Sequence, residues 1–352
     1  MAASPALPII AVCGATGKQG GGVINSLLKD APDTFAIRAI TRDETSAKAQ
    51  ALRDRGIEVV SADFDSVSSL QKAFSGAHGG ALRGLGHQGS FHQAISPSPA
   101  QQFLRSFLSC SAFCVTNFWE HFDAKREARQ AAALAQACQS AGVRHVVWST
   151  LEDTREFAKP GERMPAIGEY SVPHFDEKGA ADHLFRELKV PTTFLRTSFF
   201  FENFCDKNSG LGPQRRGAND IVLALPIADS RLPGISVHDI GGCVVGCFKD
   251  PSTINQTIGI AGDVLTGKEY AAAFSQVLGV NVMYEATAMD KYRRSGQLGV
   301  IEFANMFQFQ SDFEEQFVAC RKVNRAKELY SKLQDFKTWL TAHKADFQHV
   351  LQ

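Results

Sequence analysis

The sequence predicts an α/β protein, with a Rossmann-type doubly wound parallel sheet and a smaller C-terminal α+β lobe. Strand-like and helical segments alternate along residues 9–196, which is typical of a parallel sheet covered by helices. An apolar strand at 9–13 runs into a Gly14-x-x-Gly17-x-x-Gly20 turn, and a helix follows over 18–28. A strand, a glycine turn and a helix in this order predict a dinucleotide-binding site.

Each glycine of the turn has a local physical reason. Gly14 permits the sharp bend, Gly17 removes a side chain that would keep a pyrophosphate from the backbone, and Gly20 lets the helix pack closely on the sheet. Unpaired N–H groups at the start of the helix, with the positive end of its dipole, would then hold the phosphates. A glycine-rich turn without a ligand is the alternative that this pattern leaves open.

The second strand bears on the choice of cofactor. Strand 35–40 ends at Thr41, Arg42 and Asp43, about twenty residues past the glycines, where an NAD site would place an acid for the ribose 2′-hydroxyl. The forked guanidinium of Arg42 suits a 2′-phosphate, so the sequence favours NADP(H) over NAD(H). A solvated arginine at a strand end is the alternative. Asp43 is expected to cap the helix that begins at Thr45.

The next elements continue the alternation. Their expected order is helix 45–55, strand 57–61, helix 68–74, strand 112–116, helix 119–141, strand 143–148, helix 175–187 and strand 191–196. Gly142 is expected to end the long alanine-rich helix as its C-cap. These elements assign residues 1–210 to a Rossmann domain.

One segment, about 80–111, interrupts this domain. It has no clean periodicity and stands where loops between a helix and a strand usually take about two to six residues. It is interpreted as an insertion of poor order, rich in glycine, histidine and serine. A real lid loop and a coding error, such as a retained intron, are both compatible with it.

Residues 211–352 are expected to form the smaller lobe. Strands at 221–225, 235–237 and 257–260 mix there with helices at 240–248, 267–278 and 312–330, and an amphipathic segment at 333–342 follows. Such a lobe would roof the cofactor and contribute the substrate contacts.

The composition narrows the class of protein. The formal net charge is zero, which argues against broad electrostatic binding to nucleic acid or to an anionic membrane. No apolar run reaches the roughly twenty residues that cross a bilayer, and residues 1–8 lack the regions of a secretory signal. A cytoplasmic protein is expected, with the nucleus as a second compartment. The cysteines lack metal-type spacing, so no metal is assigned, and Cys13, Cys138, Cys243 and Cys247 are expected in the core.

Several motifs taken together resemble the NmrA-like family of atypical short-chain dehydrogenase relatives. They are CGATGKQGGG, ITRD, ADFD, FCVTNFWE, VVWSTLED, HFDEKGAADHLFRE and TSFFFENF, with a weaker likeness in ANMFQF and TWLTAHKADF. This family includes fungal nitrogen-repression regulators, animal redox sensors and fungal oxidoreductases. The insertion has no counterpart in the family pattern.

The resemblance implies a set of cofactor-binding residues at the carboxyl ends of the strands, where open sheets bind ligands. Arg42 would hold the adenosine phosphate, and Asp63 and Phe64 would lie beside adenine. Those around the pyrophosphate are Gly14, Ala15, Thr16, Gly17, Lys18 and Gln19. Those around the nicotinamide and its ribose are Thr116, Asn117, Phe118, Lys178, Phe200, Phe201, Glu202 and Asn203.

Three residues are candidates for catalysis. Short-chain dehydrogenases use Tyr-x-x-x-Lys, and here His174 stands at the tyrosine position before Lys178. The imidazole can serve as proton donor, or it can be a helix-entry residue that faces solvent. Lys178 can orient the ribose or act as acid or base, or it can be an exposed helical lysine. Ser149, at the end of the fifth strand, is a candidate to bond the substrate carbonyl, with a capping role as its alternative.

Three classes of function remain at this point. The first is an NADP(H)-dependent oxidoreductase that reduces a small hydrophobic metabolite, supported by Lys178, the strand-end hydroxyls and the aromatic loop. The second is a non-catalytic NADP(H) redox sensor that acts through protein partners, supported by the missing tyrosine. The third is a damaged or misread relative, supported by the insertion. The first is preferred.

Overall fold

The structure is a computed structural model that describes residues 7–75, 110–206, 210–217, 220–296 and 299–351. Its centre is a seven-stranded parallel sheet in the order β11-β6-β5-β4-β1-β2-β3. The strands are β1 (Ile9–Cys13), β2 (Ala36–Thr41), β3 (Glu58–Ser61), β4 (Cys110–Cys114), β5 (Val146–Thr150), β6 (Thr192–Arg196) and β11 (Thr257–Gly259). The predicted Rossmann-type doubly wound sheet is therefore confirmed.

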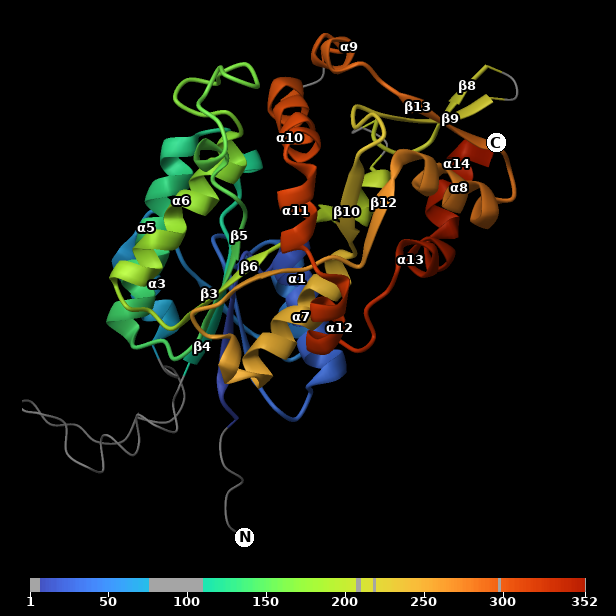
Figure 1. The fold of residues 1–352 in the computed structure, drawn as a ribbon. Coiled ribbons are helices and arrows are strands. Elements are labelled where there is room, and N and C mark those ends of the chain that lie inside the picture. Colours follow the sequence, from blue (N-terminus) through green and yellow to red (C-terminus); the bar gives the residue numbers. More distant parts are fainter. Residues whose placement is uncertain (1–6, 76–109, 207–209, 218–219, 297–298, 352) are drawn as a thin grey trace, which may run out of the picture.

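Helices cover both faces of this sheet (Figure 1). On one face α3, α5 and α6 pack side by side, and on the other α1 packs on α7, which in turn packs on α12. Their bounds are α1 (Lys18–Asp30), α2 (Ala47–Asp54), α3 (Val67–Phe74), α5 (Ala124–Ala141), α6 (Pro173–Glu187), α7 (Val237–Lys249) and α12 (Val323–Leu329). The inner strands β1, β4, β5 and β6 are therefore buried on both sides, as their apolar sequences require, whereas the edge strand β3 is partly exposed.

A smaller lobe of strands and helices lies beside this sheet (Figure 1). Its two sheets have the orders β12-β10-β7 and β13-β9-β8. Their strands are β7 (Phe199–Phe200), β8 (Gln214–Arg216), β9 (Asp220–Leu225), β10 (Arg231–Ile235), β12 (Asp263–Thr266) and β13 (Val282–Ala286). Its helices are α8 (Gly267–Leu278), α9 (Met289–Arg293), α10 (Val300–Asp312), α11 (Glu314–Cys320), α13 (Phe336–Ala342) and α14 (Gln348–Leu351). The aromatic residues of this lobe form a hydrophobic core, to which Val172 and Phe175 at the start of α6 also belong.

Two elements that follow residue 210, the expected end of the Rossmann domain, belong to the large sheet and its helix layer. Strand β11 returns to the large sheet beside β6, and α7 packs against α1. The contact between these helices is close: a Cβ on Gly241 would lie 2.3 Å from the carbonyl oxygen of Gly22. This contact holds α1 in place, and with it the glycine turn that begins the helix.

Several predicted boundaries were wrong because a better cap lies nearby. The helix expected at 119–141 begins at Ala124, since the side chain of Asp123 accepts the N–H of Arg126 and caps it. Asp43 closes a turn onto the N–H of Thr45, while Ser46 caps α2. Gly142 ends α5 in the left-handed conformation at φ 66°, as predicted.

Two predictions beyond residue 230 were also wrong. The strand expected at 235–237 ends at Ile235, because Ser236 caps α7. The single helix expected at 312–330 is two helices, α11 and α12, which are separated at Arg321. Arg321 forms a bridge to Gly259 there and is fully buried, so the backbone must leave the helix to bring it to the sheet.

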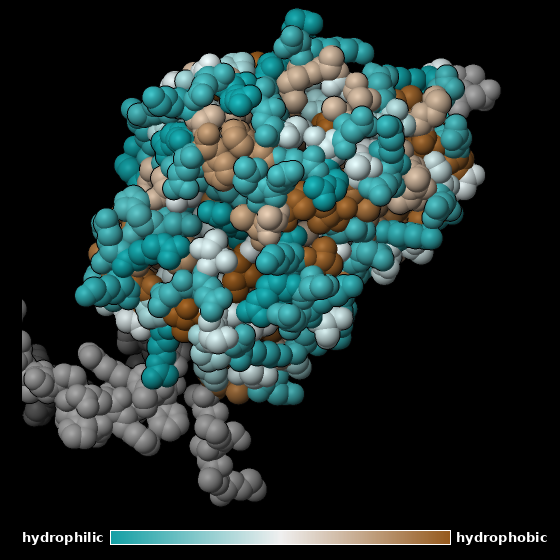
Figure 2. Space-filling view, in the orientation of Figure 1, coloured by the Kyte–Doolittle hydropathy of each residue, from teal (hydrophilic) through white to brown (hydrophobic). Residues whose placement is uncertain are grey.

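The surface seen in Figure 2 is mostly hydrophilic, and hydrophobic side chains reach it mainly along a band across the middle of the view. The cysteines predicted to lie in the core, Cys13, Cys138, Cys243 and Cys247, are all buried and free. Within the described residues, we find no helix with both the length and the apolar character of a membrane span. Apart from Cys110 and Ser111, which begin β4, the predicted insertion lies outside the described residues.

Candidate active site

A cavity of about 950 Å³ opens at the carboxyl ends of β1, β2, β4 and β5. Helices α10 and α11 of the smaller lobe contribute Phe303, Met306 and Phe317 to its wall. The predicted site residues that line it are Gly14, Thr16, Gly17, Lys18, Gln19, Arg42, Phe64, Thr116, Asn117, Phe118, Ser149, His174, Lys178, Phe200 and Asn203. The structure thus gathers into one cavity residues that are spread from the end of β1 to the 3-10 turn that follows β7.

The glycine turn has the geometry of a phosphate-binding loop. Gly14 has φ 63°, and the N–H of Gly17 donates to its carbonyl oxygen at 2.8 Å. Gly17 is the N-cap of α1 and has no side chain to bond the first N–H groups of the helix. A Cβ on Gly20 would lie 2.3 Å from the Gly14 carbonyl oxygen. The free amides and the helix dipole therefore face the cavity, where an anion would be stabilised.

Three cations lie near this turn. Lys18 begins α1, and Lys48 reaches from α2 to the carbonyl oxygen of Thr16 at 3.5 Å. Arg42 is half exposed and pairs through Nη1 with Glu120, which comes from the segment after β4. These side chains can pair with the phosphates of a dinucleotide, and Glu120 would compete with a phosphate for Arg42.

The two hydroxyls at the end of β5 have different roles. The Oγ of Ser149 faces the cavity and donates to Oε1 of Gln19 at 2.8 Å. Thr150 is fully buried and donates to Asp182 at 2.7 Å, as does Trp148 Nε1 at 3.0 Å. Burial raises the pKa of Asp182 to about 6 in spite of these hydrogen bonds. Thr150 thus fixes β5 against α6, and Ser149 is the hydroxyl that a ligand can meet.

Lys178 lies on α6 and points to the end of β4. Its Nζ donates to the carbonyl oxygen of Thr116 at 3.0 Å, to Thr116 Oγ1 at 2.9 Å and to Glu127 Oε1. Glu127 is fully buried on α5, and Thr116 Oγ1 donates to its Oε1 at 2.6 Å. The alternative of an exposed helical lysine is therefore excluded, because the lysine is 8% exposed.

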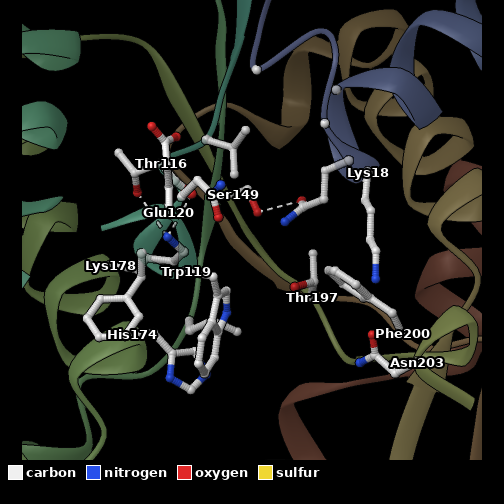
Figure 3. A pocket seen from close by; sticks show the side chains of 18 of the residues that line it. Lys18, Thr116, Trp119, Glu120, Ser149, His174, Lys178, Thr197, Phe200 and Asn203 are labelled. Carbon is white, nitrogen blue, oxygen red and sulfur yellow. Dashed lines mark hydrogen bonds between the residues drawn. The ribbon is translucent and has the colours of Figure 1, made fainter. Parts of the chain in front are cut away.

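His174, one helical turn before Lys178, is buried against the smaller lobe. Its Nδ1 bonds Oε1 of Glu302 on α10, and its backbone N–H donates to the same oxygen at 2.9 Å. The imidazole lies 4.9 Å from the ring of Trp119, which stacks on Phe303 at 4.5 Å. Figure 3 shows His174, Trp119, Lys178 and Ser149 on one side of the cavity and Lys18, Phe200 and Asn203 on the other.

Four of the predicted residues lie outside the cavity lining. Phe201 is buried against Phe336 and Trp339 in the core of the smaller lobe. Glu202 accepts the N–H of Val237 at 3.0 Å and so bonds the start of α7. Ala15 is buried under the turn, and Asp63 is exposed beside Phe64. Phe200 and Asn203 face the cavity because the 3-10 turn after β7 puts residues three apart on one side.

The sequence did not single out the partners of the catalytic candidates. Glu127 and Glu302 are far from Lys178 and His174 along the chain, and no local motif links them. Glu302 has one signal, a glutamate inside a largely apolar segment, which usually needs a buried partner, whereas Glu127 lies among charged residues in the first turn of α5 and has none. The sequence analysis also did not place Lys48, Trp119 and Phe303 in the site. Each lines the cavity only because elements distant in the sequence pack together.

Comparison with known families gives a match over most of the chain. The model of the NmrA-like family matches residues 8–81 and 102–340. The residues left out, 82–101, lie inside the segment predicted to be an insertion.

Relatives and solved structures agree with this match. The NmrA-like family domain-containing oxidoreductase malD of Malbranchea aurantiaca is 28% identical over 286 residues, which cover 78% of this chain and 74% of the relative. The oxidoreductase ptmS of Penicillium ochrochloron is 26% identical and covers 88% of this chain and 85% of its own.

Two crystal structures share the fold. NmrA, a negative transcriptional regulator, has a TM-score of 0.68 at 21% identity and covers 95% of both chains. A triphenylmethane reductase of Citrobacter sp. complexed with NADP(H) has a TM-score of 0.66 at 22% identity, over 96% of this chain and 99% of its own.

Proposed function

The chain belongs to the NmrA-like family, and from this premise we propose that it is an NADP(H)-dependent oxidoreductase that reduces a small hydrophobic metabolite. The observation that carries the proposal is one cavity with two chemically different ends. Its phosphate-binding end is formed by the turn at Gly14 and Gly17, and its other end is lined by aromatic rings, a hydroxyl and an imidazole. The second end gives room for a substrate beside the nicotinamide of a bound cofactor.

At the phosphate end, the amides that follow Gly17 would bind the pyrophosphate, and Arg42 would bind the 2′-phosphate. Thr116, Asn117 and Phe118 at the end of β4 would lie beside the nicotinamide ribose. Bound there, the reduced cofactor supplies a hydride to the substrate.

At the aromatic end, Trp119, Phe303 and Phe175 give the substrate an apolar surface and exclude water. Ser149 and His174 are the polar groups that this surface offers to a carbonyl oxygen. None of the described residues that line the cavity is a tyrosine, and we therefore assign proton donation to another residue type.

The activity is tested with purified protein, NADPH and a panel of quinones and carbonyl compounds, by following the absorbance of the reduced cofactor. Oxidation that depends on both protein and acceptor supports the proposal. Tight binding of NADPH with no oxidation by any acceptor would instead favour a redox sensor that acts through protein partners. The relatives named as oxidoreductases make turnover the expected result.

The preference for NADPH is tested at Arg42. We expect Arg42→Ala to weaken NADPH binding roughly 10- to 100-fold, which corresponds to the loss of one charge-assisted hydrogen-bonding group. NADH binding should change by less than about twofold, because its ribose offers Arg42 no phosphate. Titration of both nucleotides by calorimetry measures the two affinities.

Glu120→Gln is the matched variant, since it removes the carboxylate that pairs with Arg42. It should strengthen NADPH binding several-fold. Arg42 then has no ion pair to break before it binds the 2′-phosphate, and the phosphate is no longer repelled by a nearby carboxylate. Equal losses of NADPH and NADH in Arg42→Ala would contradict the assignment.

A further inference from the structure

Two residues on α6, Lys178 and His174, are candidates for the role of proton donor in the proposed reaction. They lie one helical turn apart and both line the cavity. Their hydrogen-bond partners differ, and this difference decides between them.

The ammonium of Lys178 has no N–H left for a substrate. A lysine carries three donors, and the carbonyl oxygen of Thr116, its Oγ1 and Glu127 Oε1 accept all of them. Glu127 is fully buried, so it cannot turn to solvent and release the ammonium without leaving a charge unpaired in the core. Lys178 is therefore held as half of a buried ion pair.

The imidazole of His174 has the opposite arrangement. Its Nδ1 is held by Oε1 of Glu302, and the same oxygen also accepts the backbone N–H of His174. Glu302 is 5% exposed, and the imidazole is wedged between it and the ring of Trp119. With Nδ1 held, Nε2 is the nitrogen that remains for a ligand in the cavity.

We propose that the His174–Glu302 pair is the proton donor of this enzyme, with Glu302 as the positioning residue that keeps the proton on Nδ1 and presents Nε2 to the substrate. Lys178 supports the cavity wall and does not transfer the proton. The inference rests on the proposed reductase function. In this arrangement α10 of the smaller lobe supplies Glu302 to a histidine of the large domain.

The form that donates is the imidazolium, which carries one proton on Nδ1 and one on Nε2. As the hydride reaches the carbonyl carbon, the carbonyl π electrons form a bond from oxygen to the Nε2 proton, and the Nε2–H bond breaks. Its electron pair stays on the imidazole, which remains bonded to Glu302 through Nδ1–H. A proton from solvent then restores Nε2–H for the next turnover.

Nitrogen NMR on protein labelled at histidine, in the presence of NADP⁺, tests the positioning role without any turnover. The signals of His174 are identified by their loss in His174→Asn. With the imidazole neutral, we expect the proton on Nδ1 and none on Nε2. In Glu302→Ala the proton should move to Nε2, the tautomer that an unconstrained imidazole prefers, and in Glu302→Gln it should stay, because the amide oxygen can still accept. A wild-type protein with the proton on Nε2 would overturn the proposal.

Kinetics with phenanthrenequinone as acceptor test the catalytic role. We expect His174→Asn to lower kcat by about 100-fold or more, as loss of a general acid does, with little change in the KM for NADPH. Glu302→Ala should lower kcat by about tenfold, and Glu302→Gln should recover most of it. His183→Asn, on an exposed position of the same helix, and Glu315→Ala, exposed on α11, are the matched controls and should leave both constants unchanged.

A double variant separates the two candidates. Lys178→Met with Glu127→Gln removes both charges of the buried pair together, so that neither is left unpaired. It should retain at least ten times the kcat of His174→Asn. A larger loss in the double variant than in His174→Asn would give the donor role to Lys178 and overturn the proposal. Failure of the wild-type protein to oxidise NADPH with any acceptor would count against the proposed function, while the tautomer of His174 would still decide the role of Glu302.

Discussion

Replacing Gly20 with alanine is expected to abolish detectable NADPH binding, a loss of at least about 100-fold. The new Cβ would lie 2.3 Å from the carbonyl oxygen and 2.6 Å from the carbonyl carbon of Gly14. These are backbone atoms, so the clash moves the start of α1 away from the turn and separates the amides that would hold the pyrophosphate. Overpacking of this kind also costs stability, by about 1–3 kcal/mol.

Gly21→Ala, one position later in the same helix, is the control. Its Cβ would lie 3.7 Å from the nearest atom, the Ala15 carbonyl oxygen, which is an ordinary contact. We expect it to bind NADPH like the wild type and to be more stable by about 0.4–1 kcal/mol, because alanine is the better helix former. Calorimetric titration and thermal unfolding of both variants provide the measurement. Equal binding by the two would mean that the close approach at Gly20 does not shape the site.

Replacing Glu152 with alanine is expected to cost about 3–5 kcal/mol of unfolding free energy, because it leaves the buried guanidinium of Arg321 without its counter-charge. Nη1 and Nη2 of Arg321 donate to the two carboxylate oxygens of Glu152 at 2.6 and 2.9 Å, and both side chains are almost fully buried. Arg321 also donates to the carbonyl oxygen of Thr197 at 3.0 Å, so this pair holds the junction of α11 and α12 to the large sheet. Urea unfolding measures the loss.

Glu156→Ala is the matched control, since Glu156 is exposed in the 3-10 turn just after Glu152. It should change the free energy of unfolding by no more than about 0.5 kcal/mol. If Glu152→Ala is as stable as this control, the buried pair does not hold the junction of α11 and α12 to the large sheet.

The effect of the Glu152–Arg321 pair on stability should also depend on pH. Burial raises the pKa of Glu152, but Arg321 and Arg196 outweigh it and hold the pKa below its usual value. The contribution of the pair is therefore complete above the usual glutamate pKa of about 4.3 and is lost as the pH falls through the lower value in the folded protein. The stability difference between wild type and Glu152→Gln should narrow over that range.

The large sheet could be predicted from the sequence because each of its parts carries a local signal. The glycine turn lies between a strand and a helix, and β1, β2, β4, β5 and β6 are short apolar segments between helices. The prediction failed at element ends, where the stronger of two neighbouring caps decides. Asp123 and Ser46 are such cases, since the side chain of each accepts a backbone N–H from the first turn of its helix and so sets where that helix begins.

The smaller lobe was predicted less well, for a physical reason. Helix α10 was missed because buried residues occupy most of its length, so it lacks the polar face that makes a surface helix recognisable. Strand β11 was predicted, but its place in the large sheet depends on a pairing with β6 across many residues, which no local pattern encodes.

The same distinction applies to the candidate site. Gly14, Gly17, Lys178 and His174 are recognisable from motifs and spacing. Glu302 is not, because it meets His174 only through the packing of α10 on α6, and the two residues are 128 positions apart in the sequence. Phe201 and Glu202 belong to a recognisable motif, yet the 3-10 turn directs them into the lobe core and to the start of α7.

In the proposed site, the main-chain amides after the glycine turn bind a pyridine dinucleotide, and Arg42 selects its 2′-phosphate. Calorimetric titration of the full chain with NADPH and with NADH tests this binding mode most directly. We expect saturable binding of NADPH at one site per chain and at least tenfold weaker binding of NADH. No heat with either nucleotide, from protein that unfolds cooperatively, would contradict it.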